Sequence, residues 1–187
     1  MQTIEFKRRP KIIGSYSIVG PKEGQGPFGS FFDYVMKKDL FGEKTYELAE
    51  RKMCEQAVMG ALQSAGLQPN DVDLMLAGDL LNQIISSSFT ARAFNMPYLG
   101  LFGACSTMAE SLATGATLVD SGHFGNVVCL TGSHFSTAER QFRFPLELGN
   151  QRVPTSQWTA TAAGATILSL EGTGPQGGLA TFGWVIY

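Results

Sequence analysis

The sequence predicts a three-layer α/β domain, in which helices cover both faces of a largely parallel sheet. Two observations lead to this prediction. Segments typical of buried strands alternate along the chain with segments whose apolar residues recur at a helical period. One strand segment, "NVVCLTG" at 126–132, is almost continuously apolar, as expected of a parallel strand that is covered on both faces.

The composition is that of an ordinary folded protein. The chain has 187 residues, of which 44% are hydrophobic and 16% charged, enough to form one domain with a core. Its net charge of −2 gives no bulk attraction to nucleic acid, so we expect no nucleic-acid partner. The opening "MQTIEFKRRP" lacks the apolar run of a signal peptide, and no window approaches a membrane span, so we expect a soluble protein.

The sequence does not indicate a disulfide framework, a metal site or a nucleotide cofactor. Three cysteines, an odd number at irregular spacing, favour a reducing compartment over a disulfide framework. Together with the two histidines they show no zinc-ligand spacing, so no metal site is expected. "GQGPFG" at 24–29 matches the dinucleotide pattern, but Pro27 removes a backbone donor and no convincing helix follows. We therefore expect no bound cofactor.

The first half of the chain alternates between strand and helix. The predicted elements are a strand at 11–19, a loop with a short helical piece at about 20–44, a helix from 45 to 65, a strand at 71–78 and a helix at 79–95. The strand 11–19 alternates in hydrophobicity, whereas 71–78 is apolar enough to be buried. The helix from Thr45 has its apolar residues on one face, and Gly66 is a plausible stop.

The second half continues this alternation. The predicted elements are a short strand at 97–103, a helix from about Ser106 to Ser121, strands at 126–132, 162–170 and 179–187, and a loop at 133–160. The larger residues of the helix's inner face are predicted to be Met108, Leu112, Ala116 and Val119. Thr107 followed by Glu110 fits a capping box. The loop carries several aromatic residues, which favours a functional loop over a disordered one.

Cys105 is the strongest candidate for a site residue. It stands in "GACSTMAES" at 103–111, between a glycine-rich approach and the start of a predicted helix. The positive end of a helix dipole favours thiolate, and nearby amides could bind an oxyanion. The alternative is a small buried residue, which is the interpretation we give to Cys54 and Cys129.

Histidines and arginines supply further candidates. His134 follows the strand 126–132 directly, at the end of the sheet where α/β proteins place ligands, and is either a site residue or a structural polar contact. His123 is most simply a surface turn residue. Three arginines in the predicted loop suit binding of carboxylates, or alternatively pair with neighbouring glutamates at the surface: Arg140, Arg143 and Arg152.

Several motifs carry a resemblance to a known superfamily. "LFGACSTMAESLATGATLVDSG" resembles the nucleophile segment of the thiolase superfamily, in which a cysteine at a helix start accepts an acyl group. "DVDLMLAGDLLNQ" and "TARAFNMPYL" resemble the preceding strand and helix. More narrowly, "GDLLNQ", "FGACSTMAES" and "SHFSTAERQFRFP" are similar to the stage V sporulation protein AD family. Those thiolase-like spore proteins are linked to uptake of dipicolinic acid.

The resemblance implies a fold, partners and a location. Residues 1–187 would be the first of the two thiolase repeats, with inserted loops at about 20–44 and 133–160, and the catalytic histidine or asparagine of the second repeat has no counterpart here. It implies binding of dipicolinic acid, either free or as its calcium chelate, in place of acyl condensation. It also implies a homodimer paired through 97–103, and a location in the spore, peripheral to the inner membrane beside other stage V sporulation proteins.

Two functions therefore stand as hypotheses. In the first, the domain is a non-catalytic binding module whose pocket holds dipicolinate. The candidate ligand-binding residues are Lys22, Asn82, Gln83, Cys105, Thr107, His134, Arg140, Arg143 and Trp158, with Phe135 and Arg152 as further possibilities. In the second, it is a condensing or acyl-transfer enzyme with Cys105 as the nucleophile. A catalytically inactive structural subunit is the third possibility.

Overall fold

The protein has a six-stranded sheet as its middle layer. The computed structural model describes residues 3–81, 84–142, 159–172 and 184–185. The strands lie in the order β3-β2-β7-β6-β4-β5. Their bounds are β2 Lys11–Val19, β3 Tyr34–Val35, β4 Leu74–Asp79, β5 Tyr98–Gly100, β6 Asn126–Ser133 and β7 Ala162–Ser169. β7 is antiparallel to both of its neighbours, and the other pairs are parallel.

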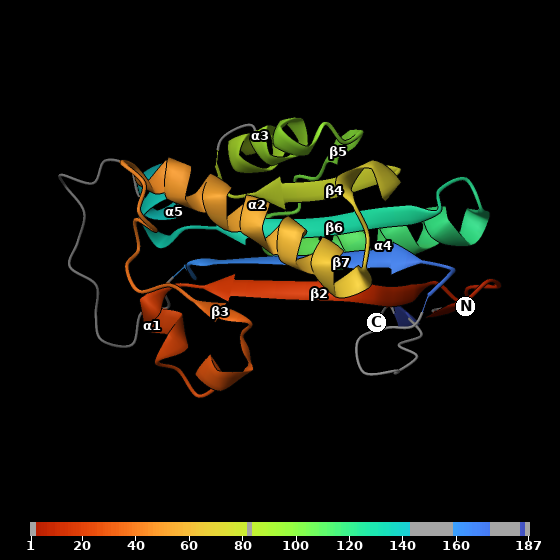
Figure 1. Cartoon of the computed structure of the whole chain (residues 1–187), viewed down its shortest axis with the longest axis horizontal. Coiled ribbons are helices and arrows are strands. Elements are labelled where there is room, and N and C mark those ends of the chain that lie inside the picture. The colour runs from red at the N-terminus through yellow and green to blue at the C-terminus, as the bar shows by residue number, and fades with distance from the viewer. Residues whose placement is uncertain (1–2, 82–83, 143–158, 173–183, 186–187) are drawn as a thin grey trace.

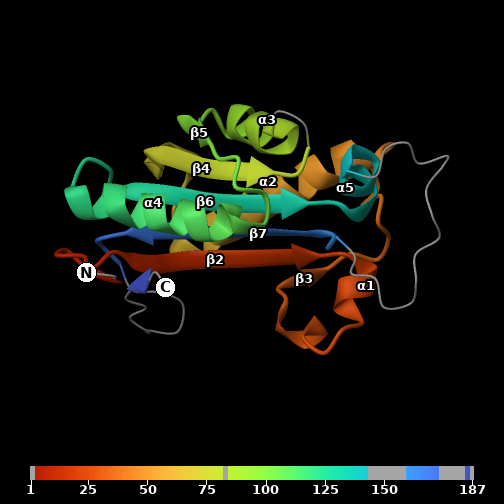
Figure 2. The ribbon, with the colours of Figure 1, turned by 180° about the vertical axis from the view of Figure 1, so that it is seen from behind.

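Helices cover both faces of this sheet. The helices are α1 Pro21–Gly24, α2 Tyr46–Ala65, α3 Ile85–Phe94, α4 Thr107–Ser121 and α5 Phe135–Phe142. α2 and α3 lie on one face and α4 on the other, as the two opposite views show (Figures 1 and 2). The predicted three-layer α/β architecture is confirmed. Within the described ranges, no helix is both long and apolar enough to cross a membrane.

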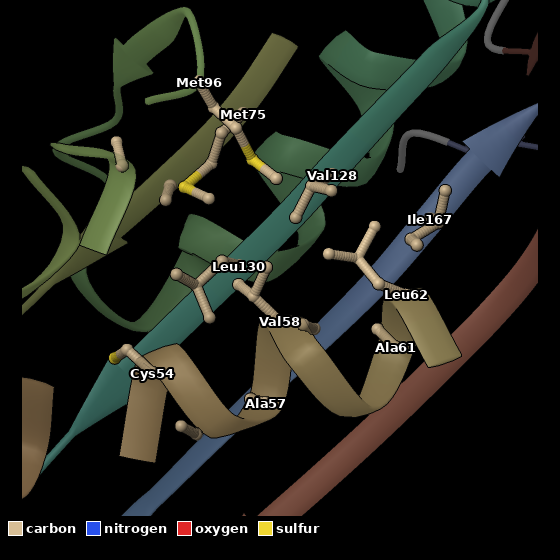
Figure 3. Packing of buried hydrophobic residues seen from close by; sticks show 14 of the residues in the cluster. Cys54, Ala57, Val58, Ala61, Leu62, Met75, Met96, Val128, Leu130 and Ile167 are labelled. Atoms are coloured by element: carbon tan, nitrogen blue, oxygen red, sulfur yellow. The ribbon is translucent and has the colours of Figure 1, made fainter. Parts of the chain in front are cut away.

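α2 forms where the sequence predicted it. The Thr45 hydroxyl caps its start by accepting a hydrogen bond from the Leu48 amide at 3.3 Å. Gly66 ends it with a left-handed backbone, φ 70°, that glycine adopts without steric cost. Its buried stripe from Cys54 to Leu62 packs on the sheet, as Figure 3 shows.

The core is split by the sheet into two halves. Neighbouring strand residues point to opposite faces, so apolar residues in a row fill both halves. Val128 packs under α2, and the next residue, Cys129, packs under α4. Ile167 and Leu168 divide in the same way. This explains why the strand 126–132 is apolar without alternation.

The prediction of a loop throughout 133–160 is wrong for its first part. Residues 135–142 form α5, whose Thr137 and Ala138 are buried while Arg140 is exposed. The buried side packs against α2, and this tertiary contact stabilises a helix of eight residues. Residues 143–158 lie outside the described part of the chain.

The predicted capping box at Thr107 and Glu110 is also wrong. A 3₁₀ turn, Ala104–Ser106, runs directly into α4, and no side chain of the cap residue bonds the helix start. Thr107 is already inside the helix, with its side chain buried. The inner face is correspondingly shifted: Ala116 and Val119 are buried, but Met108 and Leu112 are only partly so.

The edges of the fold are shorter than predicted. The strand expected at 97–103 is limited to β5, at the edge of the sheet. The strand expected at 179–187 is described only at β8, Trp184–Val185, which pairs antiparallel with β1, Thr3–Ile4. The 20–44 segment contains α1 and a 3₁₀ turn at Gly29–Phe31, in line with the short helical piece expected there.

Candidate functional site

A cavity of about 740 Å³ opens where β4 and β6 end and α4 begins. Its size lies in the range of small-molecule sites. The carboxyl ends of parallel strands are where α/β sheets place their ligands. The described residues that line it are Gly78, Asp79, Leu80, Ala104, Cys105, Met108, Thr131, Gly132, Ser133, Ala138, Glu139, Phe142, Thr159, Ala160, Ala162 and Gly164.

Cys105 lies in the turn directly before the N-terminus of α4 and lines this cavity, as its position in the sequence predicted. Its side chain is exposed, whereas the other two cysteines are buried. The residue before it, Ala104, has a φ of 46°, in the left-handed region that L-residues rarely occupy. Such a backbone at a cavity wall is typical of positions that present a side chain for function.

Gly78 allows the Cys105 turn to lie close to β4. A Cβ atom at this position would stand 2.2 Å from the Leu101 carbonyl oxygen and 2.9 Å from Thr107 Cγ2. Only glycine therefore permits the chain from 101 to 107 to pack against the end of the strand. The buried Thr107 methyl contributes to this packing, which gives Thr107 a supporting place behind the cavity wall.

Asp79 is the acidic residue at the cavity floor, and sequence reasoning did not select it. Its side chain accepts hydrogen bonds from the Ser87 amide at 2.7 Å, the Ser87 hydroxyl at 2.6 Å and the Leu81 amide at 2.9 Å. Burial nevertheless raises its pKa, against the effect of these donors. The signal was present in "GDLLNQ", where a carboxylate ends a buried strand.

α5 forms one wall of the cavity through Ala138, Glu139 and Phe142. Two carboxyl groups of α2 hold this helix. Arg140 forms an ion pair with Glu47 at the surface. The Thr137 hydroxyl donates to Glu50 Oε2 at 2.5 Å, in a buried contact. Burial, with a smaller effect of Asp79, raises the pKa of Glu50 to about 7.

The remaining predicted site residues lie elsewhere or outside the described ranges. His134 is fully buried: its Nε2 lies 3.0 Å from the Asp39 carbonyl, its Nδ1 accepts from the Ser136 amide, and its ring lies against Tyr46. Burial lowers its pKa, and it does not line the cavity. Nor do Lys22, Thr107, Phe135 or Arg140. Asn82, Gln83, Arg143, Arg152 and Trp158 lie outside the described residues.

Known structures share this fold. 3-Oxoacyl-[acyl-carrier-protein] synthase III from Aquifex aeolicus superposes with a TM-score of 0.59 at 18% identity, covering 86% of this chain and 53% of the synthase. OleA from Xanthomonas campestris, in a structure with bound lauric acid and lauroyl-CoA, gives a TM-score of 0.59 at 13% identity, covering 88% of this chain and 57% of OleA. At such identities the likeness establishes a thiolase-like fold and no more.

Sequence relatives are more specific. Stage V sporulation protein AD from Bacillus subtilis is 43% identical over 168 residues, which cover 90% of this chain and 50% of the relative. The chain thus spans about half the length of that protein. The family model for stage V sporulation protein AD matches residues 1–187. The match of the family model over the whole chain and the 43% identity to this relative show that the chain belongs to the stage V sporulation protein AD family.

Proposed function

We propose that the cavity binds dipicolinic acid and that the protein acts in its uptake into the developing spore, without catalysing a reaction. The observation that carries this proposal is the cavity at the start of α4, with the Cys105 side chain on its wall, in a member of a sporulation family. Dipicolinate is a flat aromatic dianion, and a cavity of about 740 Å³ has room for it.

Burial of a dianion requires donors for both carboxylates. The turn before α4 and its first amides offer one such place, because a helix N-terminus favours anions. Among the described lining residues the ionisable side chains apart from the thiol are Asp79 and Glu139, so the second carboxylate needs a cation from elsewhere. Arg143 and Arg152 belong to the segment that joins the lining residues Phe142 and Thr159 along the chain. A calcium ion carried with the ligand would serve the same purpose.

Cysteine-dependent acyl transfer is the second candidate, because an exposed thiol at a helix start is the arrangement of a nucleophile. OleA, which shares the fold, binds lauroyl-CoA. A thiolate needs an acid–base partner for this chemistry. The described residues that line the cavity include no histidine, which favours binding over catalysis.

The proposed partners follow from the edge of the sheet. β5 is an edge strand, and Leu99 within it and Phe102 just after it are 49% and 74% exposed. We propose that a second copy pairs with this edge to form a homodimer, since unpaired apolar edges associate. The protein would act with other stage V sporulation proteins at the spore inner membrane.

Calorimetric titration tests the binding proposal. Dipicolinate would be titrated with and without calcium, beside an acyl-CoA control, into the wild type and three alanine variants at Cys105, Arg143 and Arg152. Loss of an arginine that contacts the ligand should weaken binding by roughly tenfold or more, since a charge-assisted bond contributes about 1.5–3 kcal/mol. Cys105→Ala should weaken it less. Arg92→Ala is the matched control, because Arg92 is exposed in the last turn of α3 and does not line the cavity.

Two results would overturn parts of the proposal. If neither Arg143→Ala nor Arg152→Ala changes dipicolinate affinity, these arginines do not bind its carboxylates. If the wild type transfers acyl groups from acyl-CoA and Cys105→Ala does not, the protein is an enzyme. The same titrations should be repeated on this domain joined to a second thiolase repeat. If only the joined protein binds dipicolinate, the pocket of the isolated domain is incomplete. If neither protein binds it, the proposal fails.

A further inference from the structure

Glu50 is a fully buried carboxyl group whose hydrogen bonding is incomplete. Its exposed fraction is 0%, and its Oε1 has no hydrogen-bond partner among the described residues. The Ser86 hydroxyl of α3, which is also buried, likewise lacks a hydrogen-bond partner among the described residues. A buried carboxylate with an unpaired oxygen is costly, whereas the neutral protonated form needs fewer hydrogen-bond donors around it. The surroundings therefore favour a protonated Glu50.

The position of Glu50 connects this proton to the cavity. Its Oε2 accepts from Thr137 of α5, and the next two residues of that helix, Ala138 and Glu139, line the cavity. Asp79, whose charge disfavours ionisation of Glu50, also lines the cavity. Glu50 thus contacts the helix that forms one wall of the cavity, and its ionisation depends on the charge of a second lining residue.

We propose that Glu50 is a positioning residue that holds α5 against α2 in its protonated form, and that entry of an anion beside Asp79 draws a proton onto the Glu50–Asp79 pair. The second part rests on the proposed binding of dipicolinate. An ionised Glu50 places a second negative charge beside Asp79, and this repulsion is relieved when α5 lifts and water enters. A bound dianion adds further negative charge at the floor and favours the protonated pair.

The groups around Glu50 do not supply a compensating positive charge. The other titratable groups that act with Glu50 or Asp79 are Tyr98 of β5 and Glu47 and Cys54 of α2, while α3 contributes the hydroxyls of Ser86 and Ser87. Each basic residue beside Glu50 on α2 is paired with another carboxylate, Arg51 with Glu55 and Lys52 with Glu43. On α5, Glu139 lies beside Arg140, which is paired with Glu47, and the buried His134 precedes this helix, with its ring against Tyr46. Proton uptake is therefore the response that this site can make to added negative charge.

Binding and proton uptake can be measured together. Dipicolinate would be titrated into the protein at pH 6, 7 and 8, in buffers of different ionisation heat, which reports the protons taken up. For the wild type we expect uptake of up to about half a proton at pH 7, and affinity that weakens above pH 7 by at most ~10-fold per pH unit. Glu50→Gln, a neutral mimic, should bind at pH 8 within about twofold of its pH 6 affinity. Glu55→Gln, the matched change further along the same helix, should keep the wild-type profile, because Glu55 is paired with Arg51 and does not contact α5 through Arg140.

A ligand-free measurement tests the hold on α5 separately. Amide hydrogen exchange of residues 135–142 at pH 8 should be slower in Glu50→Gln than in the wild type, because the variant carries no charge. Thr137→Val removes the hydrogen bond from Thr137 that lowers the pKa of Glu50. The pH at which dipicolinate affinity begins to weaken should therefore be higher in this variant than in the wild type. This variant replaces Glu50→Gln as the test if Glu50→Gln does not fold.

The outcomes separate this inference from the proposed function. If dipicolinate binds without proton uptake, or with the same pH profile in Glu50→Gln, the coupling is refuted. If equal exchange is found in 135–142 for wild type and Glu50→Gln, the hold on α5 is refuted. If dipicolinate does not bind at any pH, the proposed function and the coupling fall together, and the exchange measurement still decides whether Glu50 positions α5.

Discussion

Gly78→Ala should destabilise the protein, although alanine is normally preferred to glycine inside a strand by about 0.5–1 kcal/mol. The added Cβ would stand 2.2 Å from the Leu101 carbonyl oxygen, where ordinary contacts begin at 3.4 Å. Backbone must therefore move by more than 1 Å, because a carbonyl cannot rotate away as a side chain can. Overpacking of this kind costs about 1–3 kcal/mol. We expect a net loss of roughly 1–2 kcal/mol in the free energy of unfolding.

Urea unfolding measures this loss, and Gly164→Ala is its matched control. Gly164 also lines the cavity, on β7, but an added Cβ there would meet only Met108 Cε at 3.6 Å. The control should be neutral or slightly stabilising. The displaced turn also carries Cys105, so the rate at which its thiol reacts should change in Gly78→Ala and stay constant in Gly164→Ala. Equal stabilities of the two variants would refute the argument that close packing at Gly78 sets the position of the Cys105 turn.

Three other measurements address the thiols, the buried carboxyl and the sheet edge. An aromatic disulfide reagent should titrate Cys105 in the native protein and reach Cys54 and Cys129, both 0% exposed, only on unfolding. Because burial raises the pKa of Glu50 from its usual value of 4.5 to about 7, wild-type stability should fall by roughly 3 kcal/mol as pH rises from below 4.5 through 7. Urea unfolding at pH 5 and pH 8 should show this fall in the wild type and lose it in Glu50→Gln. Phe102→Glu should shift a dimer towards monomer in sedimentation, and a wild-type monomer at micromolar concentration would contradict the proposed pairing.

The strongest local signals in the sequence predicted the framework correctly. Thr45 and Gly66 mark the ends of α2 because a cap hydroxyl and a left-handed glycine act through neighbouring backbone alone. The place of Cys105 before α4 was predicted from the glycine-rich approach to the helix, although the capping box expected there does not form. α5 was missed because an eight-residue helix depends on its contact with α2, which no local pattern shows.

The parts of the site that depend on distant contacts could not be predicted. Glu50 lies in the second turn of α2, where a glutamate normally indicates a solvent-exposed position, and its burial against Thr137 of α5 depends on a residue far away in the sequence. His134 was an even choice between site and structure, because the contact that decides it, with the Asp39 carbonyl, comes from a residue far away in the sequence. Thr107 and Glu110 had the right spacing for a capping box, but the preceding 3₁₀ turn displaced it.

The reversed strand β7 has a consequence for how the chain folds. β7 lies between β2 and β6 in the sheet, and it is the strand that pairs with β2 over nearly its whole length. This pairing can form only after residues 162–169 have been synthesised. Partners such as Ile18 and Ala163 are separated by about 150 residues, which a ribosome adds in roughly 7 to 30 s. During synthesis the α2-covered β4 and β6 can pair early, while β2 has only the two-residue β3 beside it. The earliest strand of the sheet to be made is then among the last to be completed, and its apolar edge needs protection from aggregation until β7 arrives.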